Sequence, residues 1–108
     1  MTYSIIEARR LALGVVRRLW PKSLGAFVPL KGTIHADMAA ELPGHDAGLA
    51  AVLAIHTNST RYLRSVAAEG SQRHDLNGEP VAPVSPACRE QAAVELAVRE
   101  KRRTNNVS

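Results

Sequence analysis

Prolines, glycines and short polar breaks divide this chain into short helical patterns, and this punctuation limits what the chain can fold into. Trp20-Pro21 ends one apolar pattern, Pro43-Gly44 ends another, and Ser85-Pro86 opens the last. A residue before proline avoids the α region, whereas proline itself fits the first turn of a helix. The sequence therefore predicts several short helices, which bury their apolar faces by packing on one another.

Five stretches have apolar residues at helical spacing or begin at a residue that suits a helix N-terminus, such as Thr33 or Ser59. The expected helices cover residues 3–20, 33–42, 45 or 46 to about 56, 59 to 66 or 67, and 85 to about 102. On the first helix the apolar residues at helical spacing are Ile5, Ala8, Leu11, Ala12, Val15, Val16 and Leu19. We expect these side chains to form its buried face.

Residues 72–81 indicate a small β-hairpin before the last helix. Gln72 to Asp75 and Glu79 to Val81 flank Leu76-Asn77-Gly78, and Asn-Gly favours the turn that joins two antiparallel strands. Pro83 is expected to interrupt the pattern after the second strand. The expected fold class is therefore mainly α with a small β-hairpin (α+β), one domain over residues 1–103 with a frayed tail at 104–108.

The bulk composition excludes several classes of protein. At 108 residues the chain fits one domain, and no apolar run is long enough to span a membrane. The N-terminal residues do not have the basic, apolar and cleavage-site succession of a secretory signal, so we expect none. The one cysteine, Cys88, rules out an internal disulfide and fits a reducing compartment. We therefore expect a cytoplasmic protein without a membrane partner.

The positive charge is small in total but unevenly placed. The net charge is +4, yet residues 1–31 hold six basic and one acidic side chain while residues 32–58 hold none and three. Arginine outnumbers lysine eleven to three. Because arginine pairs bidentately with phosphate and stacks on bases, this usage favours a nucleic-acid partner. A GC-rich genome is the alternative source of the same usage.

No residue pattern argues for catalysis or for a metal site. The four histidines, at positions 35, 45, 56 and 74, are too far apart for a short metal motif. Asp75 and Glu79 flank the hairpin turn, where solvated carboxylates are the ordinary expectation. The chain also lacks the motifs GxGxxG, GxxxxGK[ST] and GxSxG. We expect a protein that is not an enzyme and that needs no metal or cofactor.

The run from Ile55 to Leu63 carries the strongest local signal for a binding site. A helical pattern ends, Thr57-Asn58-Ser59 follows, and Arg61-Tyr62 opens the next helix. A helix N-terminus offers backbone N–H groups to an anion, arginine pairs with phosphate, and tyrosine stacks on a base. From these residues alone, an ordinary capped helix with Tyr62 in the core remains the alternative.

Several short motifs follow one another in an order that resembles a known family. They are Trp20-Pro21-Lys22, Pro29-Leu30-Lys31, His56 to Leu63, Arg73 to Pro80, and Ser85 to Arg89. Over roughly residues 7–98 the chain resembles the ProQ/FinO domain of bacterial RNA chaperones. The resemblance implies a compact, mainly helical fold with a concave basic face.

The resemblance also implies a function and a set of partners. Members of the family bind structured RNA, preferring a hairpin stem that continues into a single-stranded 3′ tail. They protect small RNAs and promote their pairing with target mRNAs. The expected partners are therefore small RNAs and mRNA 3′ ends, bound by a monomer.

Seven residues match the family's RNA-binding motifs, and their roles are carried over by resemblance alone. Thr57, Asn58 and Ser59 are expected to supply hydroxyl, amide and backbone donors to the terminal nucleotide. Tyr62 matches the pocket tyrosine, and the arginine before it is expected to assist. Arg73 matches a phosphate-contacting arginine. The expected RNA-binding residues are Lys31, Thr57, Asn58, Ser59, Arg61, Tyr62 and Arg73.

The helix before the polar break departs from the family pattern. It carries Asp46 and Ala50 where family members can have basic residues, which predicts weaker contact with an RNA stem. The first-helix arginines at positions 9, 10, 17 and 18 are candidates to compensate. The rival interpretation is a protein-interaction domain that kept the scaffold and lost affinity for RNA.

Overall fold

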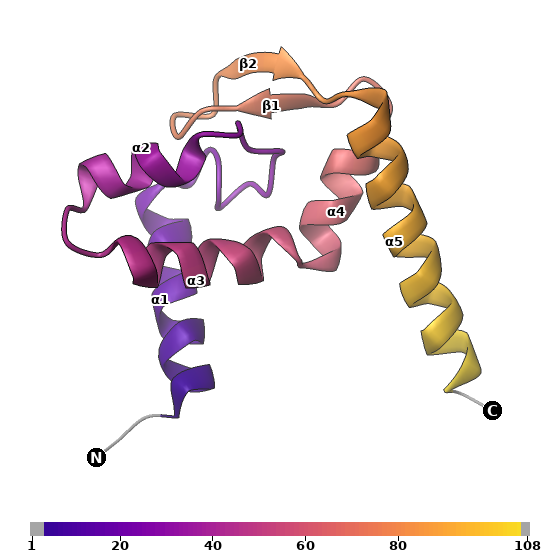
Figure 1. The fold of residues 1–108 in the computed structure, drawn as a ribbon, viewed down its shortest axis with the longest axis horizontal. Helices are drawn as coiled ribbons and strands as arrows, with labels where there is room; N and C mark the ends of the chain where they lie inside the picture. Colours follow the sequence, from indigo (N-terminus) through magenta and orange to yellow (C-terminus); the bar gives the residue numbers. More distant parts are fainter. Residues whose placement is uncertain (1–3, 107–108) are drawn as a thin grey trace.

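A computed structural model describes residues 4–106, which form a flat assembly of helices with a hairpin along one edge (Figure 1). Its extents are 42 × 39 × 19 Å. The elements in this range are α1 (Ile5–Leu19), α2 (Ile34–Glu41), α3 (Asp46–Thr57), α4 (Thr60–Ala67), β1 (Gln72–His74), β2 (Pro80–Pro83) and α5 (Pro86–Asn105). The expected class, mainly α with one small hairpin, is confirmed.

Three of the helices begin at a serine whose side chain caps the first turn. The hydroxyl oxygens of Ser4, Ser59 and Ser85 accept hydrogen bonds from the backbone N–H three residues on. Thr33 was expected to do the same before α2, but its side chain makes no such bond. The caps expected at Ser59 and Ser85 are therefore confirmed, whereas Ser4 was expected inside the first helix and instead caps it.

The two chain ends differ slightly from expectation. The helix α5 continues to Asn105, so the first two residues of the segment expected to fray are helical. The Thr104 hydroxyl donates to the Glu100 carbonyl, which supports this last turn. Residue 3 of the expected first helix and residues 107–108 of the expected tail lie outside the described residues.

The core forms where the C-terminal half of α1 packs on α3. Leu13, Val16 and Trp20 are buried there, together with Leu49 and Val52 of α3. The face predicted for α1 was mostly wrong, since six of its seven members are exposed and only Val16 is buried: the exposed ones are Ile5, Ala8, Leu11, Ala12, Val15 and Leu19. Helical spacing alone did not identify the buried face, because apolar residues occur on more than one side of α1 and only the side that meets α3 is covered.

The hairpin is a two-stranded antiparallel ribbon that recruits a third segment. Gln72 pairs with Pro83 and Arg73 with Ala82, with an irregularity before His74. Pro83 thus ends β2 within the pairing instead of interrupting it, which an edge strand tolerates. Leu30 forms a parallel bridge with His74, so the loop before α2 lies along β1. This contact between distant segments builds one wall of the site described below.

No helix in the described part of the chain is long and apolar enough to cross a membrane. In the same part, no group of three histidine, cysteine, aspartate or glutamate side chains is placed to hold a metal ion.

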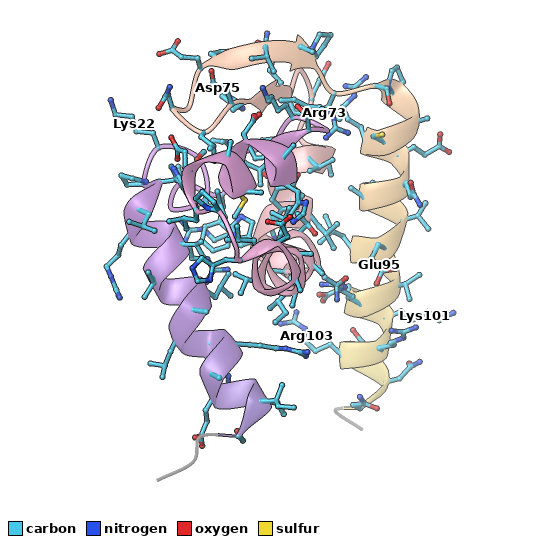
Figure 2. All side chains as sticks on the ribbon, turned by 60° about the vertical axis from the view of Figure 1, so that its left-hand side comes forward. Lys22, Arg73, Asp75, Glu95, Lys101 and Arg103 are labelled. Carbon is cyan, nitrogen blue, oxygen red and sulfur yellow. The ribbon has the colours of Figure 1, made fainter. Side chains whose placement is uncertain are left out.

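Two glycines with positive φ allow a test of how tightly the hairpin turn packs. A Cβ on Gly78 (φ +82°) would lie 2.7 Å from the Lys22 carbonyl oxygen, whereas one on Gly44 (φ +86°) would meet nothing within 4 Å. Figure 2 shows Lys22 beside the hairpin. We expect Gly44→Ala to lower the free energy of unfolding by about 1–2 kcal/mol, because alanine is strained at a positive φ. Gly78→Ala should cost the same strain plus roughly 1–3 kcal/mol, because its Cβ would overlap with Lys22.

Urea unfolding of both variants measures this difference. Equal losses for the two substitutions would contradict close packing between the turn and the loop after α1.

Candidate functional site

The backbone of residues 29–31 is the framework of the site, because four hydrogen bonds hold it in place. The Leu30 N–H donates to the Tyr62 hydroxyl oxygen over 3.1 Å, and Arg73 Nη1 donates to the Leu30 carbonyl over 2.8 Å. On either side, the His74 N–H donates to the Pro29 carbonyl and the Lys31 N–H donates to the His74 carbonyl. Tyr62 and Arg73, from α4 and β1, are thereby fixed against one short segment.

A hollow of about 380 Å³ opens beside this segment. Four of the seven expected residues line it, namely Lys31, Thr57, Tyr62 and Arg73. The rest of its wall is mostly apolar and includes Ile34 and Leu53. The structure therefore brings together residues that are up to 42 positions apart in the chain, from four different segments.

Tyr62 and Arg73 retain donor groups that the protein itself does not use. The Tyr62 side chain is 7% exposed, and its hydroxyl is an acceptor in its one bond within the described residues, so its hydrogen is free. Arg73 uses one N–H on Leu30 and one on the Cys88 sulfur, 3.5 Å away, which leaves three N–H groups. No carboxylate of residues 4–106 lies within 4.0 Å of Arg73. The hollow thus presents positive charge and hydrogen-bond donors.

Lys31 is the second cation at the hollow, and it is held by a carboxylate. Its Nζ lies 2.8 Å from Asp37 Oδ2, with the two side chains 30% and 34% exposed. Ion pairs this accessible contribute little to stability, about 0–1 kcal/mol. An anionic ligand can therefore compete for Lys31.

The other three expected residues do not line the hollow. Ser59 caps α4 by accepting from the Tyr62 N–H, and its hydroxyl donates to the His56 carbonyl. The Arg61 guanidinium lies over the Phe27 ring, 4.3 Å from its centroid. Consecutive residues of a helix point about 100° apart, and here Tyr62 lines the hollow while Arg61 lies over Phe27.

The hydroxyl hydrogens of the polar break are already used within the protein. Thr57 donates to the Leu53 carbonyl, and Ser59 donates to His56 as described above. In these positions both hydroxyls can only accept from a ligand. Donors from this segment would have to come from the Asn58 amide and from backbone N–H groups at the start of α4.

Arg99 on α5 braces this break, and the sequence contained no signal for it. Its Nη2 donates to Asn58 Oδ1 over 2.8 Å and its Nη1 to Thr60 Oγ1 over 3.2 Å. Its Nε pairs with Glu95 one turn earlier. The contact exists because α5 packs along α4, which the order of the elements does not reveal.

Behind Tyr62 lies a row of rings that ends in two arginines. The His56 ring is 5.5 Å from that of Tyr62 and stacks on Phe27 at 4.7 Å. Arg17 lies 4.4 Å from the Phe27 centroid and donates from Nε and Nη2 to His56 Nδ1. Burial, and then the charge of Arg17, lower the pKa of His56 to about 4. His56 is therefore neutral at pH 7 and accepts from Arg17 at Nδ1.

Comparisons with known proteins identify a family and a solved structure that resemble this chain. A sequence model described as the ProQ/FINO family matches residues 7–108. Among solved structures, a FinO-like RNA chaperone from Neisseria meningitidis is 30% identical, with a TM-score of 0.71 over 80% of this chain and 90% of the other. No curated protein sequence matches the chain.

The buried histidine predicts a loss of stability in acid. Since the pKa of His56 falls from 6.5 in the unfolded chain to about 4 in the fold, the unfolded state binds more protons between these values. The free energy of unfolding should thus fall as pH drops from 6.5 to 4, by about 3 kcal/mol from this group. In His56→Phe, measured by urea unfolding across this range, the decline should be smaller by that amount. Parallel profiles for the two proteins would contradict it.

The hydrogen bonds from Arg99 to Asn58 and Thr60 predict that the start of α4 becomes less ordered when Arg99 is replaced. Arg99→Ala removes two hydrogen bonds to the polar break, so we expect about 1–2 kcal/mol less stability and faster amide exchange at the start of α4. Arg103→Ala is the matched control, because Arg103 is exposed and pairs only with Glu100 on its own helix. Hydrogen exchange that is unchanged at α4 in Arg99→Ala would show that the brace does not order the break.

Proposed function

The chain belongs to the ProQ/FinO family, and we propose that it is an RNA-binding chaperone whose hollow at Tyr62 holds the 3′ end of a structured RNA. The RNA class we propose is a terminator-type hairpin with a single-stranded 3′ tail. Its cellular role would be to protect small RNAs and to promote their pairing with mRNA, as a cytoplasmic monomer without catalytic activity.

The observation that carries the proposal is the pairing of Tyr62 and Arg73 on the Leu30 backbone. Both residues line the hollow, and between them they retain a free hydroxyl hydrogen and an arginine without a carboxylate. A terminal nucleotide carries what this arrangement recognises, namely sugar hydroxyls and a phosphate. Lys31 adds a second cation, for which a phosphate can compete with the Asp37 carboxylate.

The same arrangement favours recognition of an RNA end over a base sequence. The hollow has few polar groups besides these donors, and much of its wall is aliphatic. Reading a base requires groups that match its hydrogen-bonding edge, whereas phosphates and sugars look alike at every position. We therefore propose that RNA shape and a free 3′ end dominate the preference.

A protein-interaction role is the second candidate, and one observation favours it. The stretch of α3 that faces the hollow is uncharged, with Ala50 and Ala54 in its wall, and Asp46 lies at its start. A stem that runs along α3 would gain little from it. The ratio of absorbance at 260 and 280 nm of the purified protein separates the two candidates cheaply, because bound RNA raises it.

Binding to matched hairpins tests the proposed 3′-end site. We expect tight binding to a hairpin with a 3′ uridine tail, and at least tenfold weaker binding to the same hairpin without the tail or with a 3′-terminal phosphate. Arg73→Ala should weaken binding to the tailed RNA about tenfold or more, since an arginine–phosphate contact is typically worth about 1–3 kcal/mol. Gel shift or fluorescence anisotropy measures both.

Two further variants separate binding from folding. Tyr62→Phe keeps the buried ring but removes the acceptor of the Leu30 N–H, so we expect a folded protein that is about 1–3 kcal/mol less stable and binds the tailed RNA several-fold more weakly. Arg103→Ala should bind within twofold of the unsubstituted protein, because Arg103 lies at the far end of α5 from the hairpin (Figure 2). Equally weak binding to both RNAs, or an Arg73→Ala variant that binds normally, would refute the site.

A further inference from the structure

The guanidinium groups of Arg17 and Arg61 both lie over the ring of Phe27, although the two residues belong to different helices. Their guanidinium carbons lie 4.4 and 4.3 Å from the centroid of Phe27, one reaching in from α1 and the other from α4. The two carbons are therefore no farther apart than these two distances together. Cations over an aromatic face are held in place at little cost in solvation. Phe27 thus holds two positive charges against one ring.

No negative charge compensates this pair. Within residues 4–106, neither guanidinium has a carboxylate within 4.0 Å. His56, which touches Arg17, is neutral at pH 7 and contributes no counter-charge. Burial, and then the charge of Arg61, lower the pKa of Arg17, which indicates that the two cations repel one another. An anion placed against both would relieve that repulsion.

Both arginines have donors to offer such an anion. Arg17 uses Nε and one hydrogen of Nη2 on His56, which leaves three N–H groups on a half-buried, oriented fork. Arg61 is exposed and its side chain makes no hydrogen bond within the described residues, so all five guanidinium N–H groups are free. Two forks with this many unused donors match the geometry of a phosphate.

The pair lies near the hollow but outside it. The rings of Tyr62, His56 and Phe27 follow one another at 5.5 and 4.7 Å, so the arginines stand two rings away from the tyrosine. The hollow is lined by neither of them. These separations keep the pair close enough to Tyr62 for one RNA molecule to contact both places.

We propose that Arg17 and Arg61, held on Phe27, form a second phosphate-binding site, which takes a backbone phosphodiester of the RNA whose 3′ end occupies the hollow. The inference rests on the proposed function and assigns α1 a direct part in binding. The site reads charge and shape only, because it presents arginine N–H groups and a ring that is already covered.

The dependence of affinity on salt tests this site directly. Each phosphate contact adds about one to the slope of log K against log salt. With the tailed hairpin, we expect Arg17→Ala and Arg61→Ala each to weaken binding about five- to twentyfold and to reduce the slope by about one. Arg102→Ala is the control, since Arg102 is an exposed arginine in the last turn of α5. It should bind within twofold with an unchanged slope.

Two more variants distinguish a direct contact between Arg17 and phosphate from a purely structural role of Arg17. His56→Phe removes the hydrogen-bond partner of Arg17 without changing the charge, so it should leave the salt slope unaltered even if affinity falls. Arg17→Gln keeps a side-chain N–H while removing the charge, and it replaces Arg17→Ala if that variant does not fold. It should show the reduced slope.

The outcomes distinguish this inference from the proposed function. If the unsubstituted protein binds the tailed hairpin and Tyr62→Phe weakens it, but the Arg17 variants behave like Arg102→Ala, the second site is refuted and the 3′-end site stands. If the unsubstituted protein binds neither hairpin, both proposals fail.

Discussion

The site depends on the way the backbone of residues 29–31 is held between β1 and α4. Leu30 donates its N–H to Tyr62 and accepts from Arg73, while Pro29 and Lys31 bond with His74 on both sides. Pro29 and Leu30 are buried, and a buried backbone group without a partner costs about 1–3 kcal/mol. Satisfying these groups therefore also fixes the tyrosine and the arginine that define the hollow. Structure and proposed function rest on the same hydrogen bonds.

Two supports outside the hollow hold the start of α4 in position. On one side Arg99 reaches from α5 to Asn58 and Thr60, so the C-terminal helix orders the break between α3 and α4. On the other side the neutral His56 accepts from Arg17 and stacks on Phe27. Figure 1 shows the resulting arrangement, with α1 and α5 on opposite sides of α3 and α4. The proposed RNA contacts thus depend on helices from both ends of the chain.

Much of the candidate site could be predicted from the sequence, and the missing parts share a cause. Tyr62, Arg73, Lys31 and Thr57 were expected together and do line one hollow, while their roles in RNA binding remain predictions. Arg61 was placed with them by its position beside Tyr62, yet the helix turns it toward Phe27. Motif order identifies which residues belong to a region, whereas side-chain direction depends on helix rotation and on the partners that packing supplies.

The sequence by itself determined where the elements begin and end, because capping serines, prolines and an Asn-Gly turn act through bonds within a few residues. Tertiary structure alone decided which side of α1 is buried, since that depends on where α3 crosses it. It also decided that Leu30 joins Tyr62 to Arg73 and that Arg17 meets Arg61 on one ring. These contacts join residues dozens of positions apart, and no local preference specifies them.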